Sequence, residues 1–175
     1  MAPVMPMRVT DFMSLVLERT RALVPDDLRE FKAGIRFVWL QVHYHTPKVH
    51  YEVWLTRKTG RVEIGLHFEG PREFSYRWAE LMASHMPEIQ ARLGPHVELE
   101  EWTSAWTRVH QTVAYTPLSE EMAEDVAQRL AQTIAVLQPI VERERANVPV
   151  ELEFAEPARP LGSRRFQARR RRHVP

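Results

Sequence analysis

The chain has 175 residues, no cysteine and a net charge of +1, which is typical of one domain with an appendage. The lack of cysteine excludes disulfides, thiol nucleophiles and cysteine-ligated zinc, and it predicts a reducing, cytoplasmic location. The sequence has no apolar run near the roughly 20 residues of a membrane span, so no membrane contact is expected. The charge is uneven: residues 146–175 hold seven Arg against three Glu (+4), and residues 1–145 hold 17 Lys and Arg against 20 Asp and Glu (−3).

The first predicted elements are a leader, a helix and a strand. Residues 1–9 read as a flexible leader. Thr10 or Asp11 can cap a helix that ends before Pro25. Residues 35–44 are dense in β-branched and aromatic side chains, which predicts one strand.

The clearest pattern in the chain is a β-hairpin over residues 49–68. Apolar and polar residues alternate on both sides of a short loop that contains a glycine. The loop length places Leu55 opposite Val62 and Tyr51 opposite Leu66. All the apolar residues then share one face of the sheet, so the register is consistent with the pattern.

The second half repeats the order of helix and hairpin. Residues 71–94 have helical spacing, with a kink or an interruption expected at Pro87. Residues 97–115 form a second hairpin. Ser119 then caps a last helix, with Met122 as its third helical residue, and this helix runs to about Arg145.

These elements predict an α+β fold in the order α-β-β-β-α-β-β-α. The sheet is mostly antiparallel and five-stranded, with the helices on one face. Residues 10–145 form this single domain. Residues 146–175 are rich in proline and arginine, have little to bury, and are expected to be a disordered basic tail.

The sheet face turned away from the helices has an unusual composition. The alternation places histidines, carboxylates and tryptophans on it: Trp39, Gln41, His43, His50, Glu52, Trp54, Glu63, Gly65, His67, Glu98, Glu100, Trp102, Trp106, Arg108 and His110. The structural interpretation is an exposed face with ordinary cross-strand pairs such as Glu98–His110 and Glu100–Arg108.

A functional interpretation of the same face is a metal or proton-transfer site. His50 and His67 come close enough across the strands to bind one ion, with Glu52 and Glu63 nearby. Under this alternative a divalent metal is the cofactor, held by His50, Glu52, Glu63 and His67, and the catalytic residues are Glu52, Glu63 and His67. Otherwise no cofactor is predicted.

The tryptophans point instead to a binding surface. Several on one sheet face make an apolar patch, which often marks the contact with a partner or with a second copy in a homodimer. The residues assigned to this surface are Trp54, Trp102, Trp106, Arg108, His50 and His110.

The tail adds an electrostatic feature. Arginine clusters attract phosphate backbones through counterion release, without sequence discrimination. Weak contact with nucleic acid is therefore expected from Arg164, Arg165, Arg169, Arg170, Arg171 and Arg172.

Two resemblances bear on function. The stretches at 50–55, 89–94 and 97–102 are similar to uncharacterised bacterial α+β domains, some found beside restriction-type nucleases, and this likeness covers residues 48–145. The order α-β-β-β-α-β also resembles the core of restriction-endonuclease-like nucleases. That resemblance implies an acidic residue at Glu52 and a Glu-x-Lys motif at Glu63, but Gly65 stands at the position of the lysine.

Two functions remain open on these grounds. The preferred one is a non-catalytic binding or assembly module, and the alternative is a degenerate or active metal-dependent, nuclease-like phosphodiesterase. An enzyme requires Glu52, Glu63 and His67 to converge within a few ångströms with perturbed pKa values. A binding module requires only an apolar patch with its carboxylates splayed or paired to arginine.

Overall fold

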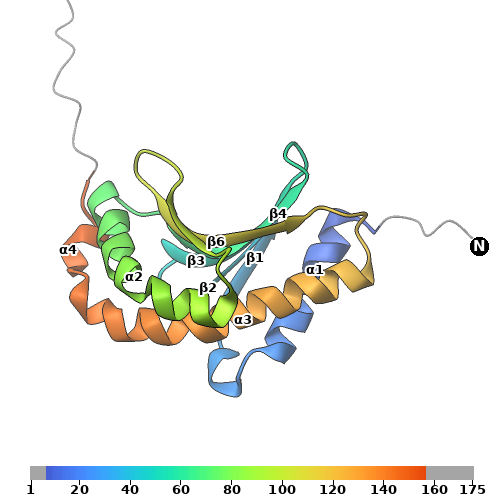
Figure 1. Cartoon of the computed structure of the whole chain (residues 1–175), viewed down its shortest axis with the longest axis horizontal. Coiled ribbons are helices and arrows are strands. Elements are labelled where there is room, and N and C mark those ends of the chain that lie inside the picture. The colour runs from blue at the N-terminus through green and yellow to red at the C-terminus, as the bar shows by residue number, and fades with distance from the viewer. Residues whose placement is uncertain (1–6, 157–175) are drawn as a thin grey trace, which may run out of the picture.

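A computed structural model describes residues 7–156 of the chain (Figure 1). The expected leader lies partly outside these residues. The six tail arginines lie wholly outside them, so their predicted contact with nucleic acid stays a prediction.

The described chain contains an α+β arrangement of helices and one sheet. Its elements are α1 (Val9–Leu23), a 3₁₀ turn (Asp26–Leu28), β1 (Lys32–Arg36), β2 (Trp39–His43), β3 (Val49–Thr56), β4 (Arg61–Phe68), α2 (Arg72–Leu93), β5 (Glu98–Glu101), β6 (Thr107–Ala114), α3 (Glu120–Glu144), a second 3₁₀ turn (Arg145–Asn147) and α4 (Val150–Glu153). Within residues 7–156, no helix is both long and apolar enough to cross a membrane.

The six strands form one open antiparallel sheet in the order β1-β2-β3-β4-β6-β5. The sheet curls, with the helices on its convex side and the β3–β4 and β5–β6 loops rising beside its concave side (Figure 1). The predicted hairpin register is confirmed, because Leu55 pairs with Val62 and Tyr51 with Leu66. The predicted fold class is therefore confirmed.

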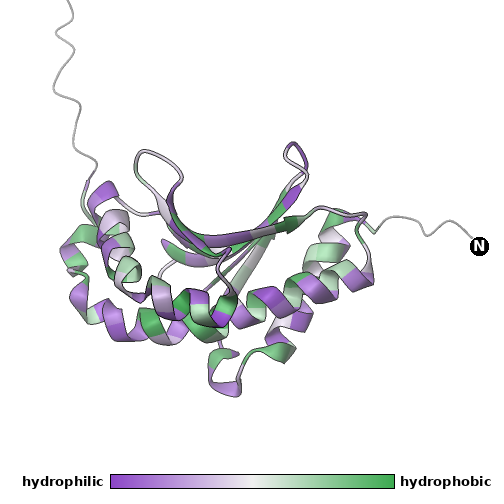
Figure 2. Cartoon of the chain, in the orientation of Figure 1, coloured by the Kyte–Doolittle hydropathy of each residue, from purple (hydrophilic) through white to green (hydrophobic). Residues whose placement is uncertain are grey.

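The core lies between the sheet and the helices. Val53, Ile64 and Leu66 of the sheet and Leu130 and Ile134 of α3 are fully buried. Along α2 and α3, hydrophobic and hydrophilic residues alternate in short stretches (Figure 2), as expected for helices with one face against a sheet.

The predicted count of five strands is wrong, because residues 35–44 do not form one strand. β1 and β2 pair with each other, with Arg36 opposite Trp39, and only Phe37 and Val38 connect them. Phe37 has a positive φ of 51° and is 75% exposed. Tight hairpin turns need residues with positive φ, and these are usually glycine or asparagine. Neither residue type is present in this turn. Four strands thus separate α1 from α2, which departs from the nuclease-like order of three.

Two further differences concern the helices. α2 continues without interruption through Pro87. The expected start of the tail at residue 146 is too early, because Val148 is buried and Leu152 of α4 packs against the core. These apolar residues lie close to prolines, which masked their helical spacing in the sequence.

The predicted cap of the last helix is confirmed and gives a first testable expectation. Ser119 Oγ accepts a hydrogen bond from the Met122 backbone N–H at 3.1 Å. We expect Ser119→Ala to lower the free energy of unfolding by about 1 kcal/mol, measured by urea denaturation, because one N–H at the helix end loses its acceptor. Ser84→Ala is the control, since Ser84 lies inside α2 on an exposed surface. An equal effect of both substitutions would contradict the capping role.

A candidate metal centre on the concave face

The centre of the concave face is made by β3 and β4. His50 lies opposite His67, and Glu52 lies opposite Gly65. Because alternate residues of a strand share a face, Glu63 projects on the same side as these four. The two imidazole rings stack, with their centroids 5.4 Å apart and their planes at 23°. The structure therefore brings together the four residues of the metal alternative.

These side chains are buried, which corrects the expectation of an exposed face. His50 is 2% exposed, Glu52 7%, Glu63 2% and His67 0%. The sheet curls at this face (Figure 1), and the ring of Trp102, from the β5–β6 loop, lies 5.6 Å from that of His67. Alternation along a strand predicts the face of a residue, but the covering of that face depends on the curvature of the whole sheet.

Tryptophans gather around this cluster. The ring of Trp102 lies 5.6 Å from that of His67, 6.3 Å from Trp54 and 5.7 Å from Trp106. The Arg108 guanidinium stands 5.1 Å from the centre of the Trp102 ring. All three tryptophans remain partly exposed. The predicted binding surface is therefore a partly exposed aromatic rim above a buried polar floor.

The orientation of His50 follows from its hydrogen bonds. Its Nδ1 lies 2.7 Å from the carbonyl oxygen of Pro47. A carbonyl can only accept, so the ring hydrogen is assigned to Nδ1 and the lone pair to Nε2. The Gln41 amide donates to this Nε2 at 3.1 Å and to Glu52 Oε2 at 2.8 Å. His50 Nε2 thus points its lone pair toward Glu52, whose Oε2 is 3.5 Å away.

His67 is held by carboxylates at both ring nitrogens. Nε2 lies 2.9 Å from Glu63 Oε1, and Nδ1 lies 3.1 Å from Glu69 Oε1. Burial alone would lower the pKa of His67, but hydrogen bonds to Glu63 and Glu69 and the charges of Glu63 and Glu52 outweigh it and raise the pKa to about 9. The ring is therefore an imidazolium at neutral pH.

The pKa of Glu52 is also shifted by its neighbours. Burial would raise its pKa, but the neighbouring His50, the charge of His67 and the hydrogen bond from the Gln41 amide lower it. Glu52 is accordingly a carboxylate at neutral pH. The centre of the face thus combines the Glu52 carboxylate with the His67 imidazolium.

The β6 side of the cluster is less completely paired. Glu63 Oε2 is buried and has no hydrogen-bond partner among the described residues, although Arg108 Nη1 lies 3.5 Å away. His110 Nε2 is 2.9 Å from Glu100 Oε2, but the angle is not that of a hydrogen bond. Burial, followed by the charge of Arg108, lowers the pKa of His110. The predicted Glu100–Arg108 pair is present, with Nη2 to Oε2 at 2.8 Å.

Two groups of donor atoms converge within metal-binding range. The ligand atoms of Glu52, Glu63 and His67 all lie within 4.8 Å of one another, and so do those of His50, His67 and Glu69. Ligand atoms about 2.1 Å from a tetrahedral ion stand about 3.4 Å from one another. Small side-chain rotations would therefore bring these donor atoms to coordinating distance. The sequence-based prediction omitted Glu69, although its spacing from His67 places it on the same face.

Comparison with known proteins identifies no relative of this chain. The chain matches no protein-family model, no curated protein and no solved structure.

Proposed function

We propose that this protein is a non-catalytic binding module that holds one divalent transition-metal ion, Zn²⁺ or Mn²⁺. The ligands are His50, Glu52, Glu63 and His67. The observation that carries the proposal is the inward orientation of two imidazoles, whose Nδ1 atoms are fixed by oxygens and whose Nε2 atoms face two buried glutamates. Metal-binding histidines characteristically donate their other ring N–H to a carbonyl or carboxylate. Because His67 is an imidazolium without the ion, an ion bound here would displace its Nε2 proton.

The charges around the site also support a cation. Glu52 and Glu63 belong to one donor group and Glu69 to the other, and the permanent cation Arg108 contacts Glu63. The buried Glu63 Oε2 lacks a hydrogen-bond partner within the described chain. A divalent ion would satisfy this oxygen and offset the excess of negative charge.

Burial favours a structural over a catalytic centre. Structural zinc sites are closed by four protein ligands, whereas catalytic sites keep a position open for water or substrate. His67 has no exposed surface, and the Trp102 ring stands over it. In this proposal the ion stiffens the floor, and the rim formed by Trp54, Trp102, Trp106 and Arg108 contacts a partner or a second copy of the chain.

A metal-dependent phosphodiesterase remains the second candidate, favoured by one observation. Glu52, Glu63 and His67 converge as that reaction requires, and the pKa values of Glu52 and His67 are perturbed. Access for a phosphodiester is the property that separates the two candidates, because the donors lie beneath the tryptophan rim.

A calorimetric titration of the full chain with Zn²⁺ and Mn²⁺ tests the metal proposal. We expect one ion per chain with a dissociation constant of about 1 µM or lower, and Glu63→Gln and His50→Gln each to weaken binding by about 100-fold or more. His85→Gln is the matched control, because His85 also contacts two glutamates but lies outside the cluster. Circular dichroism verifies that each variant is folded.

The outcomes separate the candidates. Equal affinity in the wild type and both cluster variants would refute the metal site. Hydrolysis of a phosphodiester by the metal-loaded wild type, lost in Glu63→Gln and retained in His85→Gln, would overturn the non-catalytic assignment and establish the enzyme instead.

A further inference from the structure

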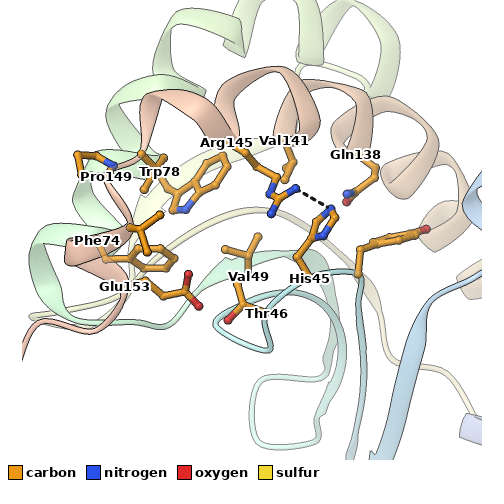
Figure 3. Close-up of a pocket in the computed structure, with 13 residues that line it drawn as sticks. His45, Thr46, Val49, Phe74, Trp78, Gln138, Val141, Arg145, Pro149 and Glu153 are labelled. Atoms are coloured by element: carbon orange, nitrogen blue, oxygen red, sulfur yellow. Dashed lines mark hydrogen bonds between the residues drawn. The ribbon is translucent and has the colours of Figure 1, made fainter.

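A cavity of about 240 Å³ lies apart from the metal centre, between α3, α4, the first turns of α2 and the loop joining β2 to β3 (Figure 3). No proposed metal ligand lines it. At about 30 Å³ per water molecule, it holds about eight water-sized groups. This is the size of a small metabolite.

One part of the cavity wall is apolar and rigid. Phe74 and Trp78 contribute from α2, Val141 from α3 and Val49 from β3. Trp78 is only 3% exposed and stacks on Phe68, with ring centroids 5.4 Å apart. Packing of this kind holds the indole in one position, so the apolar wall is preformed.

The rest of the wall carries opposite charges at separate points. Arg145 enters from the end of α3 and Glu153 from α4, and both side chains turn toward the cavity (Figure 3). These two described side chains form no ion pair with each other. Within the described chain Arg145 instead uses Nη1 to contact His45 at 3.2 Å and Glu142 at 3.6 Å.

The apolar wall also holds an unsatisfied donor. Trp78 Nε1 is buried and has no hydrogen-bond acceptor among residues 7–156. Leaving such a group unpaired costs about 1–3 kcal/mol. An acceptor group brought by a ligand would remove part of that cost.

We propose that this cavity binds a small zwitterion of the α-amino acid class with an apolar side chain. Its carboxylate pairs with Arg145, its ammonium group pairs with Glu153, and its side chain packs against Phe74 and Trp78. A simple carboxylate would meet the negative charge of Glu153, and a simple amine the positive charge of Arg145. A molecule that carries both charges complements both points of the wall.

Titration of the ¹⁵N-labelled full chain, followed by nuclear magnetic resonance, tests the proposal. The probes are L-leucine and L-phenylalanine, with 4-methylpentanoate lacking the ammonium group and 3-methylbutylamine lacking the carboxylate. We expect saturable shifts at Trp78 and Arg145 with a dissociation constant of about 1 mM or lower for at least one amino acid. The two analogues should bind at least about tenfold more weakly than L-leucine.

Substitutions of Arg145 and Glu153 test the two ion pairs proposed with the ligand. Arg145→Gln and Glu153→Gln should each weaken amino acid binding about tenfold. Arg143→Gln and Glu151→Gln are the matched controls, because both residues are exposed neighbours that do not line the cavity. The absence of saturable shifts with both amino acids, each at about 10 mM, would overturn the proposal. Equal binding of 4-methylpentanoate, or equal effects of the control substitutions, would also overturn it.

Discussion

Replacing Gly65 with alanine is expected to destabilise the protein by about 3 kcal/mol, at the upper end of the cost of overpacking. A Cβ at Gly65 would lie 2.6 Å from His110 Cβ and 2.7 Å from the Val109 carbonyl oxygen, well inside van der Waals contact. Neither atom is the flexible end of a side chain, so β4 and β6 would have to separate. Glu63 Oε1, at 3.0 Å, would be displaced as well.

Chemical denaturation measures this effect, and the same sheet provides its control. Gly34 lies in β1, and a Cβ there would meet no atom within 4 Å. Gly34→Ala should therefore leave the free energy of unfolding within about 1 kcal/mol of the wild type, or raise it slightly. If both substitutions cost the same, close packing at Gly65 is not the reason that a glycine occupies this position.

The metal-free protein is expected to lose up to about 3 kcal/mol of stability as the pH rises from about 6.5 through 9. His67 has its pKa raised from 6.5 to about 9 by Glu63 and Glu69, against the effect of burial. A group whose pKa is higher in the folded state stabilises the protein fully at pH values below its unfolded-state pKa. This stabilisation is lost as the pH rises through its folded-state pKa. The loss therefore falls on the alkaline side.

Urea denaturation in the presence of a chelator, at a series of pH values, measures this dependence. His67→Gln should be less stable than the wild type at pH 6 and should show a much flatter alkaline slope, because glutamine does not titrate. His85→Gln should keep the wild-type slope. Parallel slopes in the wild type and His67→Gln would exclude His67 as the titrating group. The lowered pKa of Glu52 acts on the acid side, where its contribution is lost as the pH falls below about 4.5.

Local patterns in the sequence predicted those features that depend on neighbouring residues. Alternation fixed the register of Tyr51 with Leu66, and the cap at Ser119 followed from its residue type and the helix after it. Both features obey a short-range rule of backbone geometry or hydrogen bonding. Phe37 escaped prediction because a bulky residue at positive φ has no local signature.

The sequence predicted which residues make up the candidate site, but it did not predict that they are buried. The face shared by His50, Glu52, Glu63 and His67 follows from alternation alone. Their burial depends on the curl of the sheet and on Trp102, which arrives from a hairpin more than 30 residues later in the chain. The cavity at Arg145 was missed for a similar reason, because it needs α4 to pack where the sequence suggested only a tail.

The strand order has a consequence for how the chain folds. β1 to β4 are consecutive in sequence and pair as neighbours, so this meander can form from local contacts before the rest of the sheet. β6 pairs with β4 only after α2 and β5 have intervened, and the β5–β6 hairpin brings Trp102 and Arg108. In that order of assembly, Glu63 would stay in contact with water until the hairpin docks. If the meander forms first, the desolvation of Glu63 falls in the later docking step, in which β6 also delivers Arg108 to within 3.5 Å of Glu63 Oε2.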